Sequence, residues 1–380
     1  MEITDVQCFL TEESGPAVFV KVSTNAGITG YGDASNHFVP QAVAGMISDL
    51  RPMLIGQDPE RIEYIWQMCF RSRFMRGGPA TGSAIGGIDM ALWDIKAKKL
   101  GVPVYQLLGG KARERVRLYG HAGGMTAQEI AENAAERVSR GITAVRFRGF
   151  HDADRKGIHD HRRGVYQQEQ FTRAIREAVG DDTDIIVECH GRYDVEWAVE
   201  LAGRLEQYRP FFLEDPIRHE NAEVFRELRK QIRIPLATGE RGHSKWELKD
   251  LIVKNAVNYL RPDICHCGGF TEMRKIAALA ETYYINLVLH NNAGPLGTAA
   301  SLHACLAIPN VALLEAPWVN RVDHERRITW PYPDVQEGFA LPLEKPGLGI
   351  EFDEKAAGLV PFKPSNVPVL RGLDGSIRDW

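Results

Sequence analysis

Short apolar runs alternate with longer amphipathic stretches between residues 115 and 315 of this 380-residue chain. Each run has the length of a buried strand, and each stretch between runs is long enough for a helix. There are eight runs, at 116–119, 144–148, 185–188, 211–214, 235–240, 259–263, 285–290 and 311–315. Eight strands that alternate with helices predict an α/β fold, the (β/α)8 TIM barrel.

The first 110 residues have a different pattern. Two strand-like runs, 17–22 and 28–32, flank the turn Asn25-Ala26-Gly27, as is typical of a hairpin. Helices are expected at 40–53, 59–70 and 81–100. We therefore predict an α+β domain over residues 1–112 and a barrel over 113–325. The Pro- and Gly-rich residues 326–380 are expected to return to the N-terminal domain.

The ends of the last six runs carry the candidate chemistry. Each run ends on an ionisable residue, and successive end residues are 23 to 27 positions apart: Glu188, Glu214, Glu240, Asp263, His290 and Glu315. Parallel barrel strands point the same way, so these side chains are expected at one rim, where barrel enzymes keep their active sites. Five carboxylates at one rim repel one another and indicate a bound cation.

Glu188, Glu214 and Glu240 form an evenly spaced trio and are the predicted metal ligands. Carboxylates without cysteine favour a hard ion, and Mg²⁺ is the usual one. Such an ion would stabilise a substrate that becomes an enolate. The alternative is that these glutamates form ion pairs with arginines or lysines at the strand ends.

His290 and Asp263 end neighbouring runs, so the carboxylate can orient the imidazole and raise its basicity. We interpret His290 as a general base, with a packed core histidine as the alternative. His190 follows Glu188 by two positions and shares its face of an extended segment. It is placed to protonate a departing hydroxide, or alternatively to support the metal ligands from behind.

Arg146 and Arg148 share one face of the second run in the same way. Arginine is a poor base but a good anion ligand. We expect these two residues to bind the substrate, with an ion pair at the barrel rim as the alternative.

Composition narrows the class of protein. The net charge of −4 and the 44% hydrophobic content are ordinary for an enzyme, and no basic stripe suited to nucleic acid occurs. We expect no membrane segment and, because residues 1–10 contain Glu2 and Asp5 but no basic stretch, no signal peptide. Six scattered cysteines fit a cytoplasmic protein. Cys265 and Cys267 lack further ligands at zinc-site spacing, so we interpret them as buried residues at a strand end.

Motifs spread over almost the whole chain extend this picture. They are Arg76-Gly77-Gly78-Pro79, Ala91-Leu92-Trp93-Asp94-Ile95-Lys96, Leu108-Gly109-Gly110, Glu188-Cys189-His190-Gly191-Arg192, Leu213-Glu214-Asp215-Pro216, Gly239-Glu240-Arg241, Pro262-Asp263, Gly268-Gly269 and Pro346-Gly347-Leu348-Gly349. Together they resemble the mandelate racemase branch of the enolase superfamily, and within it the galactonate dehydratases. The resemblance implies a modified barrel under an N-terminal α+β capping domain, whose loops near residues 11–25 and 40–60 set the substrate.

The resemblance also implies roles for individual residues. The metal ligands fall on the glutamate trio, and the base dyad falls on Asp263 and His290. The general acid falls on His190. Glu315 corresponds to the residue that helps to bind the enolate carboxylate, and Arg241 is a further expected substrate-binding residue.

Three departures from the family pattern are visible. Glu188 stands where galactonate dehydratases usually have aspartate. Arg146-Phe147-Arg148 replaces the Lys-x-Lys of many relatives, which disfavours a two-base racemase. The arginine resembles that of mannonate dehydratases, in which a nearby tyrosine acts as a base, and Tyr166 is the candidate counterpart. The loop that follows His290 also differs, so the particular acid sugar stays open.

The resemblance therefore implies a Mg²⁺-dependent hydro-lyase that converts an acid sugar to a 2-keto-3-deoxy acid. Its partner is the small-molecule substrate, without nucleic acid or membrane. Members of the family often form symmetric homo-oligomers, octamers among them. An epimerase, racemase or cycloisomerase of the same superfamily is one alternative, and a catalytically silent binding or regulatory relative is another.

Overall fold

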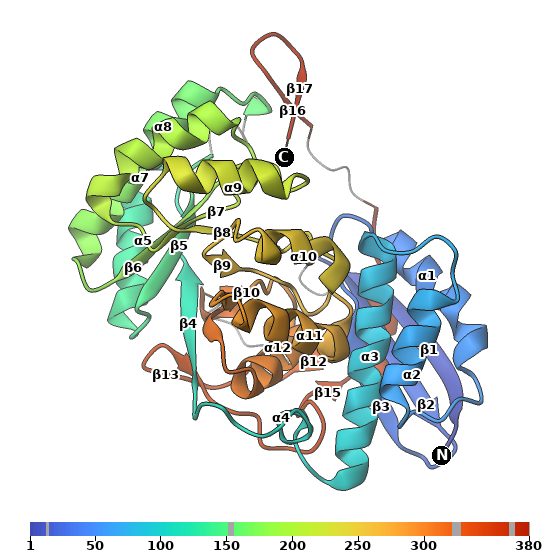
Figure 1. Ribbon diagram of the computed structural model, residues 1–380. Helices are drawn as coiled ribbons and strands as arrows, with labels where there is room; N and C mark the ends of the chain where they lie inside the picture. Colours follow the sequence, from blue (N-terminus) through green and yellow to red (C-terminus); the bar gives the residue numbers. More distant parts are fainter. Residues whose placement is uncertain (13–14, 151–155, 321–327, 365–368, 380) are drawn as a thin grey trace.

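The computed structural model describes residues 1–12, 15–150, 156–320, 328–364 and 369–379. It contains a barrel and a smaller N-terminal domain that lies beside it (Figure 1). Among the described residues, no helix combines the length and apolarity that a membrane span requires.

The N-terminal domain is an antiparallel sheet covered by helices. Its strands, in the order β1-β2-β3, are β1 (Ile3–Glu12), β2 (Pro16–Thr24) and β3 (Thr29–Asp33). Its helices are α1 (Pro40–Leu54), α2 (Ile62–Arg71) and α3 (Pro79–Leu100). Helix α3 lies so close to β3 that a Cβ on Gly32 would stand 2.9 Å from the carbonyl carbon of Gly87. The hairpin and the three helices agree with the sequence pattern, whereas β1 was not predicted.

The barrel consists of eight parallel strands, and pairing between the first and the last closes it. The strands are β4 (Val116–His121), β5 (Ala144–Arg148), β6 (Asp184–Glu188), β7 (Phe212–Glu214), β8 (Leu236–Thr238), β9 (Tyr259–Leu260), β10 (Asn286–Leu289) and β11 (Val311–Glu315). The predicted TIM barrel with an N-terminal capping domain is confirmed.

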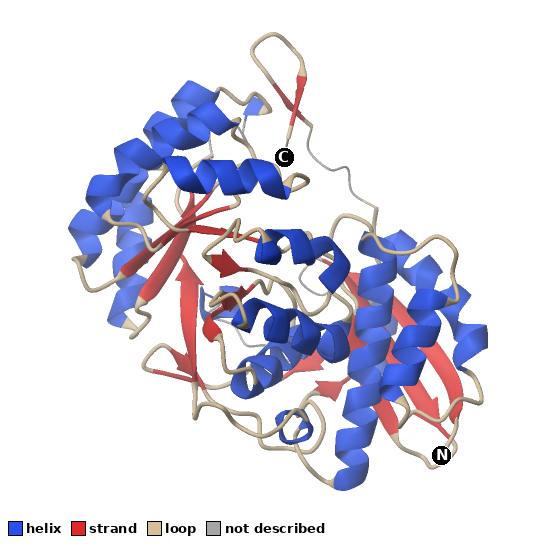
Figure 2. Ribbon diagram, viewed as in Figure 1, coloured by secondary structure: helices blue, strands red, loops and turns tan. Residues whose placement is uncertain are grey.

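Helices surround the barrel strands on the outside (Figure 2). They are α5 (Ala127–Ser139), α7 (His161–Val179), α8 (Val195–Leu205), α9 (Ala222–Gln231), α10 (Lys245–Val253), α11 (Gly269–Glu281) and α12 (Pro295–Ala307), with α4 (Val104–Leu107), η1 (Glu206–Tyr208) and η2 (Pro317–Asn320) as short connectors. Local sequence determines where several of these helices begin. For example, α5 begins with a capping box in which Thr126 and Glu129 satisfy each other's backbone amides.

The packed interior of the barrel explains why the polar residues at the strand ends form a site. Alternate strand residues form one buried apolar cluster: Tyr119, Ala144, Ile186, Phe212, Ala237, Val288 and Leu313. This packed interior forms a floor, so the polar residues at the strand ends lie above it at the C-terminal rim. Strand register then pairs them, with Glu188 opposite Glu214 and Asp263 opposite His290.

The C-terminal segment contacts both domains. It includes β12 (Thr329–Trp330), β13 (Val335–Gln336), β14 (Phe339–Ala340), β15 (Glu351–Phe352), α13 (Glu354–Leu359), β16 (Leu370–Arg371) and β17 (Ile377–Arg378). Strand β14 pairs with β4 of the barrel. Phe352 packs on Phe9, Phe19 and Tyr31 of the N-terminal sheet. The domain boundary expected at residue 325 lies outside the described residues, and the one at 112 stays a prediction.

Candidate active site

A cavity of about 800 Å³ lies at the C-terminal rim of the barrel, where the N-terminal domain covers it. The N-terminal domain contributes the segment 35–39, which follows β3, and Pro79 at the start of α3. The barrel contributes the ends of its strands. Seven of the lining residues are histidines: His37, His121, His190, His219, His243, His266 and His290.

The structure brings the glutamate trio together. Glu188 and Glu214 end β6 and β7, and Glu240 follows β8 by two residues. One carboxylate oxygen from each lies within 4.8 Å of the others. Glu188 and Glu214 are fully buried, whereas Glu240 is partly exposed and lines the cavity.

Two arginines partly neutralise these carboxylates. Arg146, from β5, contacts Glu188 and lies 3.7 Å from Glu214. Arg261, directly after β9, is fully buried and has one guanidinium nitrogen 2.5 Å from Glu214 Oε1. The alternative of strand-end ion pairs is thus partly realised, alongside the clustering expected for metal ligands.

The donor atoms of the trio suit a metal ion. Both oxygens of Glu214 are buried and accept no well-oriented hydrogen bond from the described residues. Burial and the neighbouring charge of Glu188 raise the pKa of Glu214 well above its usual value, although Arg261 opposes this. Burial also disfavours ionised Glu188, but His190 and Arg146 outweigh it and hold the pKa of Glu188 well below its usual value. An all-oxygen donor set, in which Glu214 has ion pairs but no well-oriented hydrogen bond, fits a hard divalent cation.

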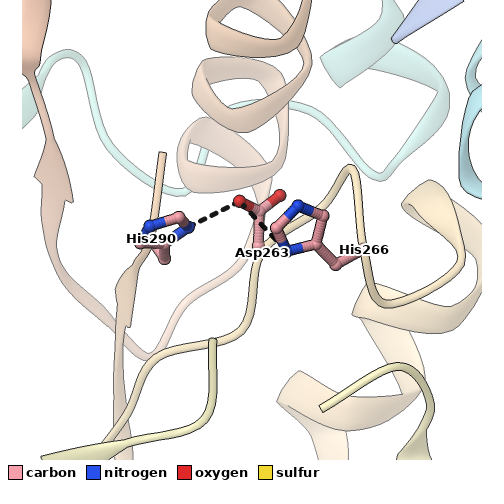
Figure 3. A group of neighbouring side chains, drawn as sticks. All are labelled: Asp263, His266 and His290. Carbon is pink, nitrogen blue, oxygen red and sulfur yellow. Dashed lines mark hydrogen bonds and ion pairs between the residues drawn. The ribbon is translucent and has the colours of Figure 1, made fainter. Parts of the chain in front are cut away.

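Asp263 and His290 form the predicted dyad. The Nδ1 atom of His290 lies 2.6 Å from Asp263 Oδ2 (Figure 3). Asp263 Oδ1 accepts a hydrogen bond of 2.7 Å from the amide of Cys265, which fixes the carboxylate. A carboxylate accepts only, so Nδ1 carries the proton and Nε2 is left as the basic atom.

The basic atom of His290 faces two carboxylates, one of them from the glutamate trio. Its Nε2 lies 3.7 Å from Glu240 Oε2 and 3.9 Å from Glu315 Oε2. Burial lowers the pKa of His290, but Glu240, Glu315 and Asp263 outweigh burial and raise it to about 10. A divalent cation on the trio would offset the field of Glu240 and bring this pKa down toward neutrality.

His190 faces the same cavity from β6. Its backbone has a φ of 51°, and its amide donates a 2.6 Å hydrogen bond to Glu188 Oε1. Its ring nitrogens lie 3.4 Å from Arg146 and 3.5 Å from Arg148. Burial lowers the pKa of His190 to about 4, and the two arginines add to this effect while Glu188 opposes it.

Glu315, at the end of β11, is buried in a network of its own. It accepts hydrogen bonds from Arg261 at 3.2 Å and from the amide of Asn291 at 3.1 Å. His121 Nε2 lies 2.7 Å from its other oxygen. Burial opposes ionisation of Glu315, but His290, His121 and Arg261 outweigh it, and its pKa is held well below the usual value.

Arg148 and Arg241 line the cavity, as expected of substrate-binding residues. A Cβ on Gly191 would stand 2.6 Å from an Arg241 guanidinium nitrogen, so glycine at this position leaves room for Arg241. Tyr166, in contrast, lies on α7, is 48% exposed and stacks on Arg204. Tyr166 is not among the described residues that line the cavity, so the structure does not support it as a candidate base.

The prediction that the capping loops set the substrate stays a prediction: among the described residues none of 11–12, 15–25 or 40–60 lines the cavity, although a Cβ on Gly15 would stand 3.6 Å from the ring of His37, which does. Residues 13 and 14 of the first predicted loop lie outside the described residues. The physical reason is that Pro16–Thr24 is committed to strand β2 and Pro40–Leu54 to helix α1, which packs against β1. Residues 35–39, between β3 and α1, and Pro79 line the cavity from the N-terminal domain.

Six charged or titratable residues at the site were not predicted from sequence, among other lining residues: His37, His121, His219, His243, Arg261 and His266. The signal for His121 was present, because β4 continues two residues past Tyr119, where the apolar run was taken to end. Arg261 directly precedes the Pro262-Asp263 motif, and a charged residue inside an apolar run is a signal that the sequence contains. His266 lies between the two cysteines considered as zinc ligands, whose thiols are buried with pKa values raised well above normal.

Comparison with known protein families identifies the family of this chain. Residues 6–109 match the mandelate racemase / muconate lactonizing enzyme N-terminal domain, and residues 129–356 match the enolase C-terminal domain-like family. The chain belongs to the mandelate racemase branch of the enolase superfamily. This confirms the resemblance.

Relatives of this enzyme family cover the full chain. The chain is 37% identical over 374 residues to a D-galactonate dehydratase of Pectobacterium atrosepticum, with 96% of each protein covered. It is 35% identical over 405 residues to a D-mannonate dehydratase of Caulobacter sp., with both proteins fully covered. A crystal structure of a Pantoea ananatis enolase-superfamily protein with bound D-gluconate and Mg is 33% identical, with a TM-score of 0.92 over 100% of this chain and 99% of that one.

Proposed function

We propose that this protein is a Mg²⁺-dependent hydro-lyase that dehydrates an acid sugar to a 2-keto-3-deoxy acid. One observation carries the proposal. The basic Nε2 of His290 faces the three-glutamate cluster across 3.7 Å, and His190 faces the same cavity from another strand. A base, an acid and an anion-stabilising cluster around one cavity are the parts that elimination next to a carboxylate needs.

The first step is removal of the C2 proton by His290 Nε2. Asp263 holds Nδ1–H and stabilises the imidazolium that forms. Mg²⁺ on Glu188, Glu214 and Glu240 supplies electrostatic stabilisation for the substrate carboxylate and for the charge that develops on it. Glu315 is held in place by His121, Arg261 and Asn291, and helps to fix the carboxylate end of the substrate.

The second step is loss of the 3-hydroxyl, which we assign to His190. Arg146 and Arg148 oppose the protonated form of His190 while no anion lies between them. A bound, negatively charged substrate offsets this field, so the pKa of His190 rises when the acid is needed. Arg148 and Arg241 contact the hydroxyl-bearing part of the substrate.

Acid-sugar specificity rests on the relatives. Galactonate and mannonate dehydratases match this chain over almost its full length, and the Pantoea ananatis structure contains an aldonate with Mg. Which acid sugar is taken depends on the cavity contacts of the segment 35–39 and of the loop after His290.

We also propose a cytoplasmic homo-oligomer, with the octamer as one form, which light scattering of the purified protein would test.

A screen in D₂O tests the proposal. Purified protein with Mg²⁺ is incubated with a panel of aldonic and aldaric acids, 2-keto-3-deoxy products are detected with semicarbazide, and deuterium at C2 is followed by NMR. We expect a keto acid that EDTA abolishes. His290→Asn should remove both signals, whereas His190→Asn should reduce keto acid formation on the order of 100-fold or more and retain C2 exchange.

The outcomes separate the alternatives. Unchanged turnover by His190→Asn would show that the acid assignment is wrong. C2 exchange with formation of an isomer, and without keto acid, would mark an epimerase, racemase or cycloisomerase. No exchange with any acid sugar, despite bound Mg²⁺, would mark a catalytically silent relative.

A further inference from the structure

The dyad has a third member that the proposed reaction does not use. Figure 3 shows the rings of His290 and His266 on two sides of the Asp263 carboxylate. The Nδ1 atoms of His290 and His266 lie 2.6 Å and 3.7 Å from the same oxygen, Asp263 Oδ2. The three ligand atoms all lie within 4.8 Å of one another.

Local backbone structure holds His266 in this place. The amides of His266 and Cys267 both donate to the carbonyl of Asp263, at 3.1 Å and 2.8 Å, and form a tight turn after β9. Gly268 and Gly269 follow with φ values of 96° and 78°, which lets the chain leave this turn and enter helix α11. His266 is thereby folded back over the carboxylate three residues before it.

Two of the three side chains are held by further contacts. His266 Nε2 lies 3.1 Å from the carbonyl oxygen of Ser35 in the N-terminal domain, so Nε2 donates, and His266 Nδ1 lies 3.4 Å from the carbonyl oxygen of Glu240 as well as 3.7 Å from Asp263 Oδ2. Asp263 Oδ1 is held by the amide of Cys265, whereas His290 Nε2 faces Glu240 and Glu315 at 3.7 Å and 3.9 Å, beyond hydrogen-bond distance. A carbonyl on the far nitrogen, as His266 has, is an arrangement that orients metal-ligating imidazoles.

We propose that Asp263, His266 and His290 form a second metal site, selective for an ion of the Zn²⁺ class. Its ligands are His266 Nδ1, His290 Nδ1 and Asp263 Oδ2. Metal–ligand bonds of about 2.0–2.1 Å put tetrahedral ligand atoms about 3.3 Å apart. The two separations from Asp263 Oδ2, 2.6 Å and 3.7 Å, lie on either side of this value, and the three side chains offer ligand atoms within 4.8 Å of one another. The ligand atoms therefore have to move by several tenths of an ångström or more to close around an ion.

The ligand chemistry separates this site from the glutamate trio. The trio offers oxygen atoms only, as Mg²⁺ prefers, whereas two imidazoles and one carboxylate suit Zn²⁺ and related transition metals. The three side chains are 5% to 18% exposed, and all line the cavity, so an ion can reach them from there. Both sites can therefore be filled in one chain by different ions.

The consequence of Zn²⁺ binding is inhibition, and this part rests on the proposed function. An ion on His290 Nδ1 takes the place of the proton on that nitrogen, and because a neutral imidazole has a single ring proton, this proton moves to Nε2. Nε2 is the atom assigned to remove the C2 proton, so metallated His290 cannot act as the base.

Metal titration of the full chain tests the binding. The protein is saturated with Mg²⁺ and titrated with Zn²⁺ by calorimetry and with Co²⁺ by visible absorption. We expect one ion per chain with a spectrum typical of nitrogen ligands. His266→Asn should weaken binding by at least about 100-fold. The matched control is His243→Asn, another cavity histidine, which pairs with Glu247 at 3.0 Å and should bind as wild type does.

The results decide between three outcomes. Absence of Zn²⁺ binding, or equal binding by wild type and His266→Asn, overturns the proposal, provided that the variant still binds Mg²⁺ and is therefore folded. Binding that is lost in Glu214→Gln but kept in His266→Asn would assign Zn²⁺ to the glutamate trio and also overturn it. Zn²⁺ binding at His266 in a protein that dehydrates no acid sugar would retain the site and reject the proposed function.

Discussion

Arg261 provides a sharp test of the electrostatic balance at this site. Its guanidinium is fully buried and contacts Glu214 at 2.5 Å, Glu315 at 3.2 Å and Glu240 at 3.5 Å. Its other terminal nitrogen donates to Tyr119 at 2.6 Å. Replacement by methionine, of similar volume, removes the charge and leaves carboxylates without their partner.

The size of the stability loss in Arg261→Met depends on which carboxylates are left without a cationic partner. Glu315 keeps its contacts with His121 and Asn291, so it is largely compensated. Glu214 keeps only Arg146, at 3.7 Å, among the described cations. Removal of one partner from a buried ion pair costs about 3–5 kcal/mol, and the residual contact places Arg261→Met near 3 kcal/mol.

Mg²⁺ should reverse part of this loss. An ion at about 100 times its dissociation constant stabilises a protein by about 2.7 kcal/mol. Without Arg261 the glutamates attract the ion more strongly, and a tenfold gain in affinity adds about 1.4 kcal/mol to the variant alone. The deficit of about 3 kcal/mol in EDTA should therefore fall to about 1.5 kcal/mol in Mg²⁺.

Urea unfolding, followed by tryptophan fluorescence with EDTA or with Mg²⁺, measures these differences. Arg113→Met is the control, because Arg113 binds the backbone carbonyls of Cys305, Ile308 and Pro309 and, among the described residues, pairs with no carboxylate. It should lose stability equally under both conditions. Equal midpoints for wild type and Arg261→Met in EDTA, or equal Mg²⁺ responses, would refute the argument.

Three further predictions follow from the structure. Burial lowers the pKa of His303 from 6.5 to about 4, so unfolding takes up a proton, and stability on the order of 3 kcal/mol is lost as pH falls from 6.5 to 4; His303→Gln should flatten this part of the unfolding profile, and an unchanged profile would contradict it. His37→Ala removes a cavity contact and should raise KM about tenfold with a smaller effect on kcat, whereas equal effects on both would exclude a role in binding. A Cβ on Gly82 would stand 2.4 Å from the His266 carbonyl oxygen and 2.7 Å from His243 Cβ, so Gly82→Ala should cost about 1–3 kcal/mol in urea unfolding, and a neutral effect would show that α3 can shift.

Much of the fold could be predicted because it depends on local periodicity. The eight apolar runs coincide with strands β4 to β11, and 40–53 and 81–100 coincide with helices to within two residues. The first strand of the chain, Ile3–Glu12, was missed because its polar residues hide the alternation. The site was predicted where a residue ends a strand, as with Glu188 and Glu214, because parallel strands carry such residues to one rim.

The sequence by itself determined the number of barrel strands and the identity of the residues at their ends, since both depend on contacts between near neighbours in the chain. The tertiary structure alone decided which segment covers the cavity and which cations balance the carboxylates. Ser35 and His266 are 231 positions apart, and Arg261 and Tyr119 are 142 apart. Contacts over such separations depend on the packing of the two domains and on the closure of the barrel, which no local pattern records.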